Sequence, residues 1–168
     1  MKNLYAPWRS DYTTSTARTK NEHASSNACV FCAHRESVQD DVKNFILKRH
    51  EHVFIMFNKF PYNAGHLLVV PYAHVGSLDL LNKEARSELI EVTSQAMTIL
   101  KHETGAEGFN SGLNIGKAAG AGIPSHLHMH VLPRFTGDTN FLPTLGQTRV
   151  ISFDLHAMYQ HLVKAFNC

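Results

Sequence analysis

The apolar residues of this chain first follow a strand-like pattern. Runs rich in Val, Ile, Leu and Phe predict strands over residues 45–49, 53–57 and 66–70. The polar stretch His50-Glu51-His52 predicts a turn between the first two strands, and Pro61-Tyr62-Asn63-Ala64-Gly65 predicts another before the third. These three runs therefore predict neighbouring strands of one sheet.

From Ser77 onward the apolar positions change to helical spacing. The apolar residues that recur every three or four positions are Leu89, Val92, Ala96, Ile99 and Leu100. Ser77 or Asn82 can cap the start of this helix and Gly105 can close its end. Residues 110–115 alternate again as a strand, and residues 154–166 predict a C-terminal helix.

Strands, a long helix and then more strands predict an α+β fold with an antiparallel sheet. A length of 168 residues suits one domain with one core, so we expect a single domain over residues 1–168. Residues 10–27 are rich in Ser, Thr, Asn and Lys, so we expect residues 1–28 to form a partly extended N-terminal arm.

The overall charge points to neither a nucleic acid nor a membrane as a partner. The formal net charge is only +2, from 16 Lys and Arg against 14 Asp and Glu. No apolar run approaches the ~20 residues of a membrane span, and the N-terminal region lacks an apolar signal segment. The default expectation is a cytoplasmic protein.

Three histidines stand at every second position near the end of the chain. On a strand, His126, His128 and His130 would share one face, while Leu127, Met129 and Val131 would pack on the other. Imidazole can donate, accept or attack near neutral pH, so this face predicts a reaction centre. The alternative is three histidines on a solvated strand face.

A loop of small residues, Gly116 to Gly122, immediately precedes these histidines. It contains Gly116, Gly120 and Gly122 and no bulky side chain, so its backbone N–H groups can approach an anion closely. We interpret it as a phosphate cradle that faces a nucleophile. Lys117 is either an added charge for the distal phosphates or a solvated lysine.

Cys29 and Cys32 form a C-x-x-C pair, which has three interpretations. A thioredoxin-type redox pair requires a βαβ context that the pattern lacks. Two structural cysteines at this spacing by chance are a second interpretation. A tetrahedral zinc site, the third, requires two more nitrogen or sulfur ligands.

The segment His-Leu-His-Met-His-Val-Leu resembles the signature of the histidine triad (HIT) family of nucleotide hydrolases and transferases. The resemblance extends to Gly65–Pro71 with His74, and to the loop of residues 116–122. Residues 4–9 and 137–141 resemble a bacterial branch of diadenosine tetraphosphate phosphorylases and hydrolases. The resemblance implies a five-stranded antiparallel sheet with one long helix across it, a C-terminal helix, and a homodimer.

The resemblance also implies roles for single residues. His128 would become nucleotidylated, and His130 would stabilise the phosphate oxygens as the leaving group departs. Residues that would contact the nucleotide are Ser125, Asn114 and Asn58, with Gly120 and Gly122 in the phosphate loop and Phe54, Met56 and Phe60 walling the base. Ordinary core packing is the alternative for the last three.

The zinc-bearing branch of the family implies a ligand set for the C-x-x-C pair. Carried over to this chain, the ligands are Cys29, Cys32, His74 and His126, with His34 as a rival. Such a zinc would be structural, and by fixing His126 it would help to orient His128.

The leading hypothesis is a nucleotidyl-transfer enzyme that cleaves dinucleoside polyphosphates at the α-phosphate, with water or phosphate as the acceptor. A nucleoside phosphoramidase would use the same histidines on a P–N bond. A zinc-bearing nucleotide-binding module with weak catalysis is the third hypothesis, and the presence of His128 argues against it.

Overall fold

The computed structural model describes residues 29–138 and 153–167. The expected N-terminal arm, and the parts of the family-like segments that fall on residues 4–9 and 139–141, lie outside the described residues. The single-domain expectation for the whole chain therefore stays a prediction.

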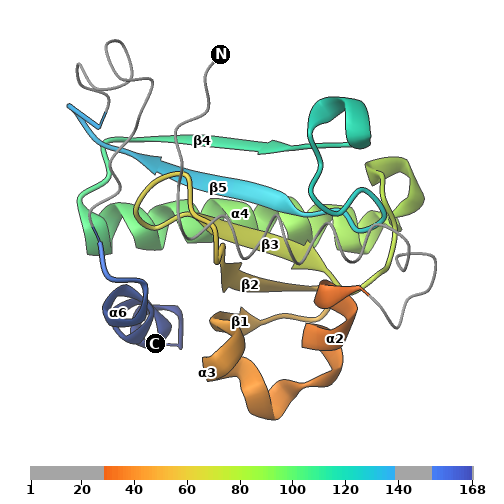
Figure 1. Cartoon of the computed structure of the whole chain (residues 1–168), viewed down its shortest axis with the longest axis horizontal. Helices are drawn as coiled ribbons and strands as arrows, with labels where there is room; N and C mark the ends of the chain where they lie inside the picture. The colour runs from red at the N-terminus through yellow and green to blue at the C-terminus, as the bar shows by residue number, and fades with distance from the viewer. Residues whose placement is uncertain (1–28, 139–152, 168) are drawn as a thin grey trace.

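Five strands form one antiparallel sheet in the order β1-β2-β3-β5-β4 (Figure 1). The strands are β1 (Ile46–Arg49), β2 (Val53–Phe57), β3 (Leu67–Pro71), β4 (Gly108–Leu113) and β5 (Met129–Arg134). The short turns at residues 50–52 and 58–66 make the first three strands neighbours in space, as the sequence predicts. β5 then inserts between β3 and β4, so the histidine segment leads into an interior strand of the sheet.

The long helix α4 (Lys83–Thr104) lies across one face of the sheet, and α6 (Leu155–Asn167) lies beside it near β1 (Figure 1). The side chain of Asn82 accepts a hydrogen bond from the Ala85 N–H at 2.8 Å, so Asn82 and not Ser77 caps α4. Gly105 ends the helix in the left-handed conformation. The predicted α+β fold with its five-stranded antiparallel sheet, long helix and C-terminal helix is confirmed.

Each face of the sheet has its own apolar cluster. Val53, Ile55 and Phe57 of β2 point toward α4 and α6, whereas Phe54 and Met56 point to the opposite face. The alternation continues through the histidine segment, where the cluster under α4 includes Leu127, Met129 and Val131. The histidines between these residues therefore lie on the face opposite α4.

The segment before β1 forms helices that the apolar pattern did not predict. They are α2 (Val30–Glu36), the 3-10 turn η3 (Val38–Asp40) and α3 (Asp41–Asn44). Phe45, expected to open the first strand, instead ends α3 in the left-handed conformation with φ of 58°. Its buried ring packs edge-on against Tyr159, and this burial favours a conformation that a bulky residue rarely adopts.

Two strand boundaries also differ from the prediction. β4 runs over residues 108–113, and Ile115 is exposed beyond it. β5 begins only at Met129, because the backbone N–H of His126 donates to Ile123 and that of Leu127 donates to Val75, outside the β4 ladder. Of the three histidines, only His130 lies within a strand.

Candidate active site and metal centre

The histidines lie on the sheet face opposite α4, under the segment that carries α2. His126 and His128 are buried, 1% and 7% exposed, and the ring of Phe31 in α2 contacts both with centroids 5.2 Å apart. His130 is half-buried, with its ring centroid 5.1 Å from that of His128. The three side chains therefore form one enclosed row and not a solvated face.

The backbone holds the ring of His128 in a defined tautomer. Its Nδ1 lies 2.9 Å from the carbonyl oxygen of His126, a partner that can only accept, so Nδ1 carries the proton. In the neutral ring, Nε2 then presents a lone pair. This is the state that a nucleophilic imidazole requires.

A fourth histidine, His66, fixes the tautomer of His130. The Tyr62 backbone N–H donates to Nδ1 of His66 at 3.1 Å, so the proton of the neutral His66 ring is on Nε2. That Nε2 lies 2.9 Å from Nδ1 of His130 and donates to it. The proton of neutral His130 must then be on its Nε2, a buried atom without a hydrogen-bond partner among the described residues. His130 thus presents an unused donor beside the lone pair of His128.

The sequence interpretation did not single out His66 as functional. Its only signal was a histidine at the head of an otherwise apolar run, where no polar partner is visible in the sequence. The sheet supplies the partner, because β3 pairs with β5 in a register that sets Leu68 opposite His130.

Burial keeps these rings neutral near physiological pH. The pKa of His66 falls to about 3, chiefly by burial and then by the neighbouring His130 and His128. Burial, followed by the effect of His128, lowers the pKa of His130 to about 4. Burial also lowers the pKa of His128, partly opposed by its hydrogen bond to the His126 carbonyl.

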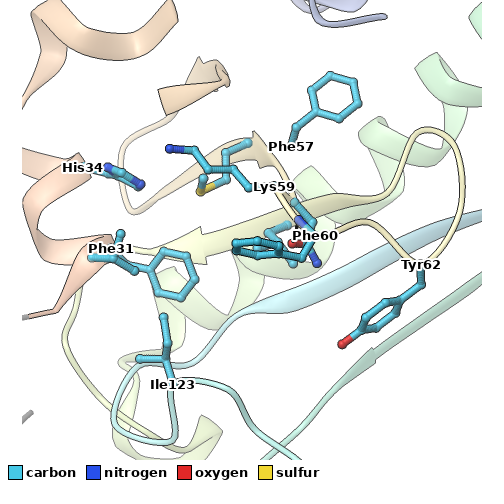
Figure 2. A pocket seen from close by; sticks show the side chains of 11 residues that line it. Phe31, His34, Phe57, Lys59, Phe60, Tyr62 and Ile123 are labelled. Atoms are coloured by element: carbon cyan, nitrogen blue, oxygen red, sulfur yellow. Dashed lines mark hydrogen bonds between the residues drawn. The ribbon is translucent and has the colours of Figure 1, made fainter. Parts of the chain in front are cut away.

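An apolar pocket opens beside the histidines, between α2 and the segment that follows β2 (Figure 2). Figure 2 shows Phe31 and Phe60 on opposite sides of the open space, with Ile123 below them. Among the residues expected to contact a nucleotide, Met56, Asn58 and Phe60 line this pocket. Its lining is mainly apolar, as suits a planar base, and its polar groups include the amide of Asn58 and the imidazole of His34.

A second hollow lies on the β4 side of the histidines. Its lining includes His66, His130 and Asn114, the last of which we expected to contact phosphate or ribose. Tyr62 lines both hollows. The row of histidines therefore has a recess on each side.

Phe54 does not lie where the sequence interpretation expected it. It points to the same face as Met56 but is fully buried, stacked on Tyr72 with ring centroids 5.5 Å apart, and it does not line the pocket. The reason is its position on β2: Phe54 pairs with Val70 near the end of β3, whereas Met56 pairs with Leu68. Phe54 is a core residue.

The loop of residues 116–122, which we expected to cradle phosphate, is short, built of small residues and largely exposed. Gly120 adopts φ of +83°, and its N–H donates to the carbonyl of Lys117 at 3.0 Å, so that N–H serves the turn and is not free for an anion. Gly122 is exposed and Ser125 half-buried, and both lie between this turn and His126. Their contact with phosphate stays a prediction.

Four side chains of types that can bind a metal meet at the other end of the histidine row. The Sγ atoms of Cys29 and Cys32 lie 3.3 and 3.6 Å from Nδ1 of His126. Nδ1 of His74 lies 3.2 Å from both Sγ of Cys32 and Nδ1 of His126. Tetrahedral zinc with Zn–S of ~2.3 Å and Zn–N of ~2.0 Å places its ligands about 3.3 to 3.8 Å apart, so this Cys2His2 set fits.

The tautomer of His126 also suits metal binding. Its Nε2 lies 2.8 Å from the Pro71 carbonyl and must donate to it, which leaves the Nδ1 lone pair facing the cluster. The four ligand atoms lie within 4.8 Å of one another. His34, the rival ligand, is not in this cluster and lines the apolar pocket instead.

A close backbone approach brings His74 to His126. Gly76 lies so near residues 124–125 that a Cβ at this position would come within 2.5 Å of the Pro124 carbonyl oxygen. The hydrogen bond from the Leu127 N–H to the Val75 carbonyl, 2.7 Å long, joins the same two segments. The turn after β3 is thereby held against the segment before β5.

Comparisons with known proteins agree with this arrangement. Residues 39–137 match the sequence model of the HIT domain. AP-4-A phosphorylase of Mycobacterium tuberculosis is 33% identical over 151 residues, which are 90% of this chain and 77% of that protein. Among solved structures, a Zn-bound histidine triad family protein from Mycobacterium smegmatis is 28% identical with a TM-score of 0.68, over 85% of this chain and 96% of that one.

A diadenosine triphosphate hydrolase from Plasmodium falciparum, 18% identical, shares the fold with a TM-score of 0.57, over 74% of this chain and 78% of that one. Within the described residues, no helix combines the length and apolarity that a membrane crossing requires. The domain match spans more than half of the chain, the mycobacterial relative spans nearly all of it, and the histidine row has the spacing of the signature. The chain belongs to the histidine triad, or HIT, family.

Proposed function

We propose that the protein is a nucleotidyltransferase that cleaves dinucleoside polyphosphates similar to diadenosine tetraphosphate through a nucleotidyl intermediate on His128. The observation that carries the proposal is the pairing of two opposite groups: an Nε2 lone pair on His128 and an unused Nε2 donor on the adjacent His130. The similarity to an AP-4-A phosphorylase supports the substrate class.

In the proposed reaction, Nε2 of His128 attacks the α-phosphorus, and an N–P bond forms as the bond to the bridging oxygen breaks. The Nε2 proton of His130 is donated toward that oxygen, which stabilises the charge on the departing nucleoside triphosphate. An acceptor then attacks the same phosphorus and frees His128. Water gives a nucleoside monophosphate, and inorganic phosphate gives a nucleoside diphosphate.

The nucleotide that becomes attached would occupy the apolar pocket, with its base between Phe31 and Phe60 and its ribose near Asn58. The hollow on the β4 side, which contains Asn114, would receive the distal phosphates or the acceptor. Ser125, Gly120 and Gly122 lie on the loop side of the same histidines.

We also propose that Cys29, Cys32, His74 and His126 hold one structural zinc ion. A zinc ion bound there would neutralise the thiolates and fix the imidazole of His126. The carbonyl of His126 in turn holds the ring of His128, so the metal centre would position the nucleophile. The homodimer implied by the family resemblance remains part of this proposal, and light scattering of the purified chain tests it.

Product analysis tests the reaction. The full-length protein is incubated with diadenosine tetraphosphate, with and without millimolar phosphate, and AMP, ADP and ATP are separated by chromatography. A phosphorylase gives ADP and ATP when phosphate is present, whereas a hydrolase gives AMP and ATP under both conditions. Cleavage of an adenosine phosphoramidate without cleavage of the dinucleotide would instead identify a phosphoramidase.

The His128→Ala variant tests the intermediate. Because this change removes the nucleophile but not the pocket, kcat should fall by about 10⁴-fold or more while the protein still binds mononucleotide. The matched control is His156→Ala, at an exposed position on α6. Near-normal kcat in the His128 variant would refute the proposed mechanism.

A further inference from the structure

The apolar pocket has one polar end, formed by His34 and Lys59. Figure 2 shows the imidazole of His34, from α2, and the ammonium group of Lys59, from the segment after β2, pointing toward one another across this end. The Phe31 and Phe60 rings lie nearer the middle of the pocket. A base held between these rings would therefore direct one edge toward His34 and Lys59.

His34 is a buried residue whose ring has no hydrogen-bond partner among the residues that the structure describes. The residue is only 7% exposed, and its backbone carbonyl accepts from Arg49, but its ring makes no hydrogen bond within the described part of the chain. The two ring nitrogens of His34 can therefore form hydrogen bonds to a group that enters the pocket. The pocket is where a partner for this ring can enter.

The charge at this end is positive and unbalanced. Among the described residues that line the pocket, Lys59 carries the only formal charge and no carboxylate is present. The ammonium group lies 5.9 Å from the centre of the Phe45 ring. The pKa of Lys59 is lowered, first by burial and then by Lys43.

We propose that His34 and Lys59 contact the edge of the bound base, and that the pocket prefers a purine with a carbonyl group at position 6, as in hypoxanthine or guanine, over adenine. The inference rests on the proposed function, and it adds the class of base that the same site selects. An ammonium group can only donate hydrogen bonds. N7 accepts in both kinds of purine, so the difference lies at position 6: O6 of a 6-oxopurine accepts, whereas the 6-amino group of adenine is a donor that would face the cation.

The ring of His34 can form a hydrogen bond to the remaining polar group of the base edge, whether that group is a donor or an acceptor. A neutral imidazole has one donor and one acceptor nitrogen, so it can bond the base on the side that Lys59 does not reach. His34 and Lys59 together would thus supply more donors than acceptors, which matches an oxo edge. Neither residue touches the reacting phosphorus in this scheme, so both affect base selection and not the chemical step.

Isothermal titration calorimetry of the full-length, zinc-loaded protein with AMP, IMP and GMP tests the proposal. IMP differs from AMP only in the group at position 6 and in the proton on the neighbouring ring nitrogen, N1. A comparison of the two nucleotides therefore isolates this edge of the base. We expect IMP and GMP to bind about tenfold more tightly than AMP, the value of one charge-assisted hydrogen bond at a partly solvated site. Lys59→Met and His34→Leu should each bring the ratio of the AMP and IMP dissociation constants close to one.

Lys101→Met, at an exposed position on α4, is the matched control and should keep the wild-type ratio. If His34→Leu fails to fold, Lys59→Met still decides the outcome, because Lys59 is exposed at the rim. AMP binding as tightly as IMP in the wild type, or an unchanged ratio in Lys59→Met, would overturn the inference while leaving the proposed reaction intact. If none of the three nucleotides bound, the inference and the proposed function would both be wrong.

Discussion

At the scale of single residues, the histidines of this site differ in what fixes each ring. His126 donates to the Pro71 carbonyl, His128 to the His126 carbonyl, and His130 accepts from His66. Three identical side chains therefore present three different second nitrogens: a lone pair toward the Cys and His cluster on His126, a lone pair on Nε2 of His128, and a donor on Nε2 of His130. The backbone and His66 create this difference, which the alternating sequence alone does not contain.

The link between His66 and His130 predicts a positioning role for His66. His66→Leu removes the donor to His130 Nδ1, so the proton of His130 is no longer held on Nε2, and kcat should fall by about 10²-fold with little change in KM. His66→Gln can still donate from its amide and should recover part of this loss. Steady-state kinetics with diadenosine tetraphosphate measures both values.

Nitrogen-15 NMR of the histidine rings gives an independent readout, since it reports which nitrogen of His130 carries the proton. The spectrum should show the Nε2–H form in the wild type and a mixture of forms in His66→Leu. Equal kcat in the wild type and the His66→Leu variant would show that the proton of His130 is placed without His66.

At the scale of elements, the cysteine and histidine cluster joins three segments that are distant in sequence. Cys29 and Cys32 come from the start of α2, His74 from the turn after β3, and His126 from the segment before β5. We expect Cys32→Ser to lose most of the zinc and several kcal/mol of unfolding free energy. Metal analysis and urea unfolding measure these changes, with Cys168→Ser as the control. Full zinc content in Cys32→Ser would contradict the ligand assignment.

Gly76 allows the segments that carry His74 and His126 to lie close together. In Gly76→Ala the new Cβ would lie 2.5 Å from the Pro124 carbonyl oxygen, so the turn that carries His74 must move away from the segment that carries His126. We expect about 1 to 3 kcal/mol lower stability and weaker zinc retention against a chelator. Gly112→Ala, where a Cβ meets nothing within 4 Å, is the control. Equal stability of the two variants would show that the turn adapts without cost.

The elements also mark how far the sequence alone could predict the fold. Strands β2 and β3 and helix α4 have strong periodicity and recognisable ends, and the structure places them within about one residue of prediction. The α2 and α3 helices are short and lack an apolar stripe, so the periodicity could not reveal them. His66 and the exclusion of Phe54 depend on strand register, which is a property of pairing between distant segments.

At the scale of the whole molecule, the buried histidines couple stability to pH. The pKa values of His66 and His130 lie at about 3 and about 4, well below the ordinary value near 6.5, so the fold favours their neutral forms. Above pH ~6.5 these rings are neutral in both states and the stabilisation is complete. As the pH falls below ~6.5, the unfolded chain takes up protons that the folded chain excludes, and stability is lost until the pH reaches the folded pKa values.

Unfolding in urea at pH 7 and pH 5 measures this dependence. Each histidine with a lowered pKa reduces the free energy of unfolding by about 1.4 kcal/mol per pH unit below ~6.5. His66 alone should therefore reduce it by about 2 kcal/mol at pH 5. His66→Gln cannot bind this proton, so its stability should fall less between the two pH values than that of the wild type. His156→Gln, at an exposed position, should behave as the wild type. Because both variants keep all four cluster residues, acid release of a metal would affect them equally, and the difference between their slopes isolates His66. Identical slopes would mean that the His66 ring is not kept neutral by its burial.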